Sequence, residues 1–307
     1  MKKLTPYIVE GLVAGVLVYY ASTRIDTSTT TPAQVSELPT PEPTAPAPLE
    51  PLPTPKGTVS YHTLATTSPK PAAELANDVG LSHVDFTLSL NRLDQAHIPQ
   101  GTTFVVPDSF ADLDAYSPFP ETIENANDIP KLFIISQRVQ AFGAYEYGKR
   151  VHWGTVSTGK ESTQTPSRLY STNWKGKLVH STIEDAWLLP WYFNLDSMEG
   201  ISMHQYDLPG YPASHSCIRM SGKDAEWVYN WADQWVLSPD GNTRLAYGTP
   251  VIIYGQYAYG KTAPWKKLAQ DPTATSLGES ELADIVSQYH REILERQTQR
   301  QQILGEQ

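Results

Sequence analysis

The stretch SHSCIRM, Ser214 to Met220, contains Cys217, the only cysteine among 307 residues. A single cysteine excludes a disulfide within the chain, so its thiol stays free for chemistry. Most lone cysteines are small buried hydrophobic residues, and an inert Cys217 stays an alternative. An ordinary thiol is mostly protonated at neutral pH, so a nucleophilic Cys217 needs a base.

Two histidines are close to Cys217 in the sequence, His204 and His215. If Ser214 to Met220 is extended, His215 and Cys217 share one face with Cα atoms about 6.6 Å apart, which is awkward for a direct hydrogen bond. His204 ends the run GISMH and can reach the thiol from a neighbouring strand if the intervening loop folds back. We therefore predict His204 as the base.

Other site chemistries fit the sequence less well. A zinc site built from His204, His215 and Cys217 would need more ligands, and the chain has no CxxC or HExxH spacing. A serine nucleophile at Ser214 or Ser216 lacks the G-x-S-x-G elbow. We expect a cysteine nucleophile that uses neither a metal nor another cofactor.

Residues 131–258, which surround this stretch, are rich in predicted strands. The strand runs are KLFIIS, RVQAFGAY, GKRVHWGTVSTG, WLLPWYFNL, GISMH and GTPVIIYG. Tyr147-Gly148-Lys149 is typical of a turn between two of them. One helix is predicted after Ser221, which forms a capping box with Asp224, and its apolar positions extend to Trp235. Trp227, Trp231 and Trp235 are expected to pack in the core.

The N-terminal residues 1–26 predict membrane targeting. Lys2 and Lys3 precede an apolar run from Tyr7 to Ser22, which favours an orientation that places the rest of the chain outside the cytoplasm. The segment is either a retained anchor in the inner membrane or a cleaved signal. Residues 27–56 contain nine prolines and no aromatic residue, as in an extended linker. We expect a periplasmic domain on a tether.

The net charge of -10 excludes the basic surface that nucleic-acid binding requires.

A small α+β module is predicted at residues 57–107. A strand near Val59, a helix beginning at Pro71, a helix to Leu90 capped by Ser82 with Asp85, and the strand TTFVVP follow in order. The stretch NRLDQAHIPQGTTFVVP resembles a LysM module, which implies binding of wall glycan. A structural packing domain of the same topology is the alternative.

The remaining segments are a connector at residues 108–130 and a C-terminal extension at residues 259–307. From Leu277 onward an amphipathic helix is predicted, and it is expected to pack on the body of the protein. Its apolar side is formed by Leu282, Ile285, Val286, Tyr289, Ile293 and Leu294.

Four stretches, VSTGKESTQTPSRLYS, ISMH, SHSCIRM and YGTPVIIY, resemble in order and spacing the YkuD-type L,D-transpeptidases of bacterial cell walls. The resemblance implies a YkuD-like β-sandwich in which Cys217 is the acylated nucleophile and His204 its base. It implies support from His215 and from the carbonyl of Gln205, which would orient the imidazole. Ser216 stands where the family has glycine, which tolerates a positive φ.

The implied reaction is acyl transfer between stem peptides of peptidoglycan. Cys217 would attack the third stem residue and expel D-alanine, and an amine of a second stem would then form a 3-3 crosslink. Backbone N–H groups of Ser216 and Cys217 would hold the oxyanion. Candidate substrate-binding residues are Ser214, Tyr206 and Arg219.

Two alternatives to the transpeptidase function stay open. A hydrolase of the same fold would pass the acyl group to water, either as an L,D-carboxypeptidase or as an amidase that releases wall-linked protein. A non-catalytic wall-binding protein with a degenerate site is the other.

Overall fold

The computed structural model describes residues 59–181, 184 and 186–305. All of them belong to the compact unit Thr54–Gln307. The predicted membrane segment 1–26 and the linker 27–56 lie outside the described residues. Within the described part of the chain, no helix is both long and apolar enough to cross a membrane.

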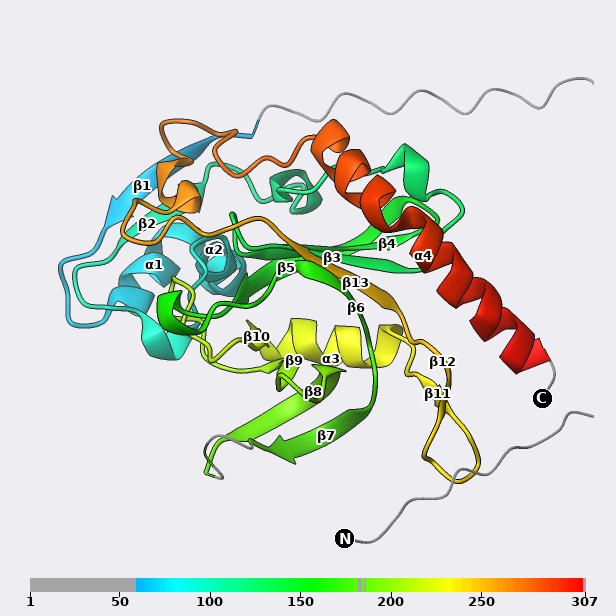
Figure 1. The fold of residues 1–307 in the computed structure, drawn as a ribbon. Coiled ribbons are helices and arrows are strands. Elements are labelled where there is room, and N and C mark those ends of the chain that lie inside the picture. Colours follow the sequence, from blue (N-terminus) through cyan, green and yellow to red (C-terminus); the bar gives the residue numbers. More distant parts are fainter. Residues whose placement is uncertain (1–58, 182–183, 185, 306–307) are drawn as a thin grey trace, which may run out of the picture. The chain divides into compact units, whose positions relative to one another are not determined.

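A nine-stranded sheet forms the centre of this unit, which is mostly β (Figure 1). The strand order is β6-β13-β3-β4-β5-β10-β9-β8-β7. The strands are β3 (Leu132–Ser136), β4 (Ala141–Glu146), β5 (Lys149–Ser157), β6 (Arg168–Ser171), β7 (Lys175–His180), β8 (Leu188–Asp196), β9 (Ile201–Gln205), β10 (Ile218–Met220) and β13 (Pro250–Tyr254). The pairs β13–β3 and β10–β9 are parallel. The predicted strand runs are confirmed, whereas β7 was not expected.

The predicted turn between β4 and β5 is confirmed by the backbone. Tyr147 and Gly148 have φ angles of 48° and 72°. Two successive residues of positive φ are typical of the tight hairpin turn whose twist matches that of the flanking strands.

The sheet curls until its two halves face each other across one apolar core. Phe133 and Phe142 from β3 and β4 stack with ring centroids 4.8 Å apart, and they share a cluster with Phe193 and Met203 from β8 and β9. The two layers of the expected sandwich are therefore halves of one continuous sheet. Helix α3 (Gly222–Trp231) lies between them in Figure 1.

Helix α3 begins as predicted and ends earlier than predicted. Ser221 accepts a hydrogen bond from the backbone N–H of Asp224, which is the expected cap. Ala232 has ψ of 144° and leaves the helix, so the expected continuation to Trp235 is wrong. The backbone N–H of Trp235 donates instead to the carbonyl of Asn173. A pairing with a distant loop replaces the last turn of the predicted helix.

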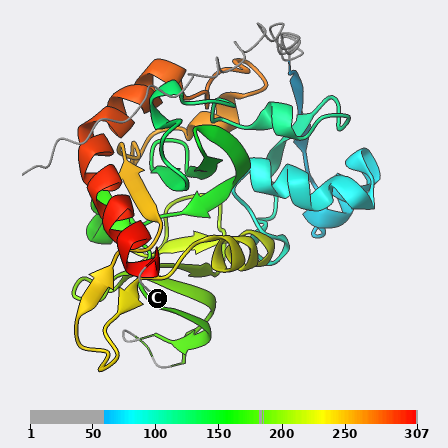
Figure 2. The same cartoon turned by 90° about the vertical axis from the view of Figure 1, so that its right-hand side faces the viewer.

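Helix α4 (Glu279–Gly305) covers the other face of the sheet. Leu282, Val286 and Ile293 are buried in a cluster with Ile134 and Ile252 from β3 and β13. This confirms that the C-terminal helix packs on the body. In Figure 2 this helix (red) lies to the left of the view and the module at residues 59–107 (cyan) lies to the right.

The module has the predicted strand–helix–helix–strand order. Its elements are β1 (Tyr61–Ala65), α1 (Pro71–Val79), α2 (Val84–Leu90) and β2 (Thr103–Pro107), and β1 pairs antiparallel with β2. The predicted capping box is wrong, because Ser82 lies in a separate 3-10 turn and Asp85 accepts a hydrogen bond from the side chain of Gln95. No side chain caps α2.

Short elements complete the described residues. They are β11 (Val236–Leu237), β12 (Arg244–Ala246) and 3-10 turns at Leu81–His83, Gln95–His97, Asp114–Tyr116, Glu124–Ala126, Glu161–Thr163 and Pro264–Lys267.

Replacement of Ile293 tests how firmly α4 is held. Ile293→Ala is expected to lower the free energy of unfolding by about 2 to 5 kcal/mol, because it leaves a cavity at a fully buried position. Leu304→Ala, on the same helix at a position that is 48% exposed, is the control and is expected to cost less than about 1 kcal/mol. Urea unfolding measures both changes. Equal small costs would show that α4 is not part of the cooperative fold.

Candidate active site

Cys217 is the residue immediately before β10, and the parallel pairing of β10 with β9 decides what lies beside it. Arg219 pairs with His204 in this ladder. The Sγ atom of Cys217 lies 3.3 Å from the hydroxyl of Ser202, and the thiol donates to the carbonyl of Gly200 at 3.3 Å. The chain between β9 and β10 therefore folds back as expected and brings the thiol to the strand that carries His204.

The extended conformation considered for Ser214 to Met220 holds only for its second half. Only Ile218–Met220 is a strand, and Ser216 has a φ of 79°. The hydroxyl of Thr165 donates to the carbonyl of Ser216 at 2.9 Å, and the Ser216 hydroxyl donates to the carbonyl of Thr163 at 3.2 Å. These hydrogen bonds hold serine in a conformation that glycine adopts at lower cost.

The loop that holds Ser216 belongs to the stretch VSTGKESTQT. In this loop the backbone at Thr163 passes so close to Gly159 that a side chain at residue 159 would not fit. A Cβ atom at Gly159 would lie 2.1 Å from the carbonyl oxygen of Thr163. The hydroxyl of Thr163 donates to the carbonyl of Ser214, and the backbone N–H of Lys160 donates to the same carbonyl, both at 3.0 Å. The two stretches thus form one hydrogen-bonded loop pair.

His204 is buried, with 4% of its surface exposed, and its tautomer is determined by one hydrogen bond. Its Nδ1 lies 2.9 Å from the carbonyl oxygen of Gln205. A carbonyl only accepts, so Nδ1 carries the proton and Nε2 keeps a free lone pair. Burial lowers the pKa of His204 to about 4, the Gln205 carbonyl opposes this shift, and the charge of Arg219 adds to it.

The thiol is also in its neutral form at rest. Burial raises the pKa of Cys217, and hydrogen bonds from Ser202 and the charge of Arg219 only partly oppose that shift. A neutral imidazole therefore lies near a neutral thiol. Thiolate would form when His204 takes up a proton as the reaction begins.

His215 has a different partner. Lys160 Nζ lies 3.0 Å from its Nε2, and because an ammonium only donates, that nitrogen accepts. Burial, followed by the charges of Lys160 and Arg219, lowers the pKa of His215. Its Nε2 lone pair is occupied, which leaves His204 as the histidine with a free basic nitrogen at this site.

A pocket gathers these groups. It is lined by Ser181, Trp187, Leu189, His204, Tyr206, Ser214, His215, Cys217 and Arg219. The guanidinium of Arg219 lies 4.6 Å from the centre of the Tyr206 ring. Gln205 and Ser216, which were predicted with these residues, do not line the pocket and act on it through the backbone.

Several residues of the site were not predicted from the sequence. Ser181, Trp187 and Leu189 line the pocket, and Lys160 and Ser202 contact His215 and Cys217. Ser202 had a usable signal, because it stands two residues before His204 in ISMH and strand side chains alternate with a period of two. Trp187 begins the aromatic run WLLPWYFNL, which was interpreted only as a strand. Nothing local to Lys160 indicates its pairing with His215.

Residues 130–253 match the family model of the L,D-transpeptidase catalytic domain, YkuD. This segment belongs to the YkuD family. It contains the whole pocket and every strand of the central sheet except the last residue of β13, Tyr254. The module at residues 57–107 and helix α4 lie outside it. No curated protein matches the chain.

Several solved structures resemble parts of the chain. An L,D-transpeptidase from Stackebrandtia nassauensis has 21% sequence identity and a TM-score of 0.34, and the match covers 42% of this chain and 57% of that one. One from Mycobacterium smegmatis has 16% identity and a TM-score of 0.33, covering 41% and 59%. An L,D-transpeptidase in complex with imipenem has 16% identity and a TM-score of 0.32, also covering 41% and 59%. The chain thus spans less than two thirds of each.

Substitutions at Ser216 test whether the YkuD loop is strained. Ser216→Ala keeps the positive φ and loses the hydroxyl hydrogen bonds, so the free energy of unfolding is expected to fall by about 1 kcal/mol. Ser216→Gly loses the same bonds but relieves a backbone cost of about 1 to 2 kcal/mol, so it is expected to be near neutral. Thermal unfolding of both variants measures the difference. A glycine variant that is less stable than the alanine variant would contradict the strain.

The raised pKa of Cys217 predicts its reactivity toward iodoacetamide. Less thiolate is present at a given pH than for an ordinary thiol, so alkylation is expected to be slow at neutral pH and to keep rising above about pH 8.5. Mass spectrometry across a pH series, with a cysteine-containing peptide as reference, measures the rates. A plateau below about pH 7 would instead indicate a resting thiolate–imidazolium pair.

Proposed function

We propose that the protein is an L,D-transpeptidase that forms 3-3 crosslinks in peptidoglycan through an acyl-enzyme on Cys217. The observation that carries the proposal is the pocket in the YkuD segment that Cys217 and His204 both line. The Nδ1 atom of His204 is held by the carbonyl of Gln205, so its Nε2 is the basic nitrogen. An uncommitted basic nitrogen beside a lone thiol is the arrangement that nucleophilic catalysis needs.

Acylation begins with a proton transfer within the pocket. The S–H bond, which points to the Gly200 carbonyl at rest, turns toward His204 Nε2 and gives up its proton. The sulfur attacks the carbonyl carbon of the third stem residue and a tetrahedral oxyanion forms. Collapse breaks the peptide bond to D-alanine, whose amine takes the proton from His204, and a thioester on Cys217 remains.

The second half returns the enzyme to its resting state. An amine of another stem peptide attacks the thioester and His204 accepts the amine proton. The C–S bond then breaks, and His204 returns this proton to the sulfur, which restores the thiol. Backbone N–H groups at Ser216 and Cys217 are the proposed oxyanion donors, and the positive φ of Ser216 supports this because it sets their direction. Arg219 and Tyr206 are proposed to bind the stem peptide, since a guanidinium suits a carboxylate.

The site of action is proposed from the sequence alone. Residues 1–26 would hold the protein at the periplasmic face of the inner membrane, and residues 27–56 would let the catalytic unit reach the wall. Wall glycan is a proposed ligand of residues 57–107. These assignments rest on the targeting pattern and on the LysM-like stretch.

Acylation by imipenem tests the nucleophile and its base. The purified protein is expected to gain a covalent adduct by mass spectrometry, and Cys217→Ala is expected to gain none. His204→Gln is expected to slow acylation by about 100-fold or more, since general base catalysis contributes about that much. His215→Gln is the matched control and is expected to change the rate far less, because Lys160 occupies its Nε2. A folded wild-type protein without an adduct would contradict the proposal.

Disaccharide tetrapeptide stems test the acceptor. We expect crosslinked dimers with release of D-alanine, resolved by liquid chromatography and mass spectrometry. Tripeptide without dimers would show that water accepts the acyl group and would replace the transpeptidase by a hydrolase of the same fold. If imipenem acylates the enzyme but the stems yield neither dimers nor tripeptide, tetrapeptides are excluded as acyl donors.

A further inference from the structure

The module at residues 57–107 contacts the catalytic segment at the chain that leaves His204. Leu93 and Pro209 form an isolated antiparallel bridge. The backbone N–H of Asp94 donates to the carbonyl of Leu208 at 3.0 Å, and that of Gly210 donates to the carbonyl of Arg92 at 2.8 Å. A short ladder of backbone hydrogen bonds therefore joins the module to the chain that follows β9.

The side chain of Asp94 strengthens this ladder. One carboxylate oxygen accepts from the backbone N–H of Leu208 at 2.7 Å. The other accepts from the backbone N–H groups of Ala96 and His97 at 2.9 and 3.0 Å, and from His97 Nδ1 at 2.7 Å. Asp94 is thus bonded on both sides, and its carboxylate joins a turn of the module to the catalytic segment.

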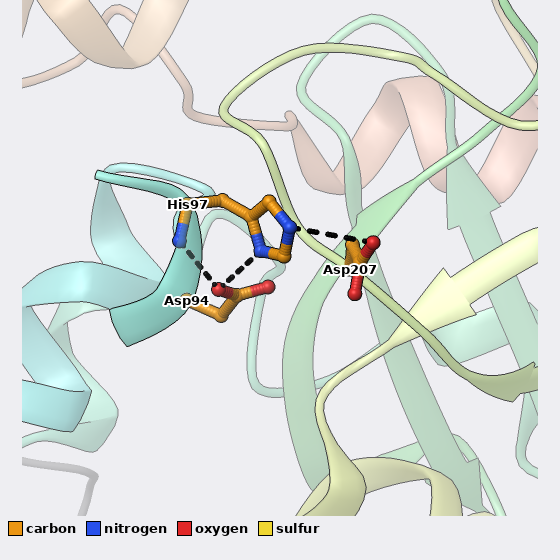
Figure 3. Close-up of side chains that lie close together, drawn as sticks. All are labelled: Asp94, His97 and Asp207. Atoms are coloured by element: carbon orange, nitrogen blue, oxygen red, sulfur yellow. Dashed lines mark hydrogen bonds and ion pairs between the residues drawn. The ribbon is translucent and has the colours of Figure 1, made fainter. Parts of the chain in front are cut away.

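His97 extends the link to a second aspartate. Its Nε2 lies 3.3 Å from a carboxylate oxygen of Asp207, so the imidazole bridges one aspartate of the module and one of the catalytic segment (Figure 3). One carboxylate oxygen from each aspartate and one ring nitrogen of His97 all lie within 4.8 Å of one another. Both carboxylate oxygens of Asp94 accept hydrogen bonds from other residues of the protein. We therefore interpret Asp94, His97 and Asp207 as a structural bridge.

The module side of the contact is itself firmly held. Arg92 is 2% exposed, and its guanidinium donates to the carbonyls of Leu90 and Val139 and lies 4.8 Å from the Trp265 ring. Val139 belongs to the turn between β3 and β4, and Trp265 to the C-terminal extension. The residues that contact Leu208 are therefore anchored to two separate segments that follow the module in the sequence.

The held chain, residues 205–210, carries the groups that orient the site. The carbonyl of Gln205 determines the tautomer of His204, and the ring of Tyr206 lies against Arg219. Arg219 also approaches the carbonyl of Asp207 at 3.5 Å. A displacement at Leu208 would reach His204 through three intervening residues of backbone.

We propose that Asp94 is a positioning residue of the active site, which holds residues 205–210 so that the Gln205 carbonyl keeps His204 in its Nε2-basic form. The module thereby completes the catalytic centre, although it lies outside the matched domain. This inference rests on the proposed function for its catalytic consequence, while the effect on His204 can be measured without any reaction.

Asp94→Asn tests the proposal in the full-length protein. An amide offers a single acceptor oxygen in place of two, so either Leu208 or the His97 turn loses its partner. The maximal rate of acylation by imipenem is expected to fall by about 10- to 100-fold, because small misplacements of a catalytic group have effects of this size. The imipenem concentration at half-maximal rate and the alkylation of Cys217 by iodoacetamide are expected to stay within about twofold, since loss of positioning acts on the step that needs His204.

A histidine of the module and the first residue of the connector provide a matched control. His62 bridges Asp108 at 2.7 Å and Asp78 at 3.3 Å, the same arrangement as around His97. Asp108→Asn is expected to leave acylation unchanged. Asp207→Asn, at an exposed position, is a second test that removes only the bridge from His97 and is expected to give a smaller loss.

Nitrogen-15 NMR of labelled histidine reports on His204 directly. Wild type and Asp108→Asn are expected to show protonated Nδ1 and bare Nε2, and Asp94→Asn a mixture of tautomers. If wild type is not acylated but the tautomer shifts in Asp94→Asn, the proposed function fails and the positioning role stands. A folded Asp94→Asn with an unchanged tautomer overturns the inference, and so does an unchanged acylation rate in an active enzyme.

Discussion

The parallel pairing of β10 with β9 is the contact on which the site depends. Arg219 lies opposite His204 in that ladder, so Cys217 emerges beside Ser202 and close to the strand that carries the imidazole. Parallel neighbours cannot be joined by a tight turn, so the chain between them must leave the sheet and return. The held loops of the active site are a consequence of this connection.

That connection, residues 206–217, is supported by segments that are distant in the sequence. Its first part is bonded to Asp94, its middle to Ser157, whose hydroxyl donates to the carbonyl of Tyr211, and its last part to the loop of Thr163. Each support restricts a stretch of backbone that bears a pocket residue. This connection has no regular secondary structure, but hydrogen bonds to its backbone at several points fix the positions of the pocket residues.

Burial then decides the protonation state of the reacting pair. An apolar surrounding disfavours charge, so the pKa of His204 is lowered and that of Cys217 is raised. In the proposed reaction a neutral pair would create charge only when the oxyanion and the imidazolium form together. The Gln205 carbonyl favours this, because it accepts from Nδ1 in both states of the ring.

Local chemistry and side-chain alternation were enough to predict most of the sheet and to select Cys217 and His204 as the candidate nucleophile and base. A lone cysteine with His204 at the end of a strand was the signal for the candidate site, and the apolar runs predicted β3, β4, β5, β9 and β13. Only the tertiary structure decided where α3 ends, that Lys160 engages His215, and that Asp94 contacts Leu208. Each of these depends on a hydrogen bond between segments far apart in the chain, and no local pattern of residue types encodes such a partner.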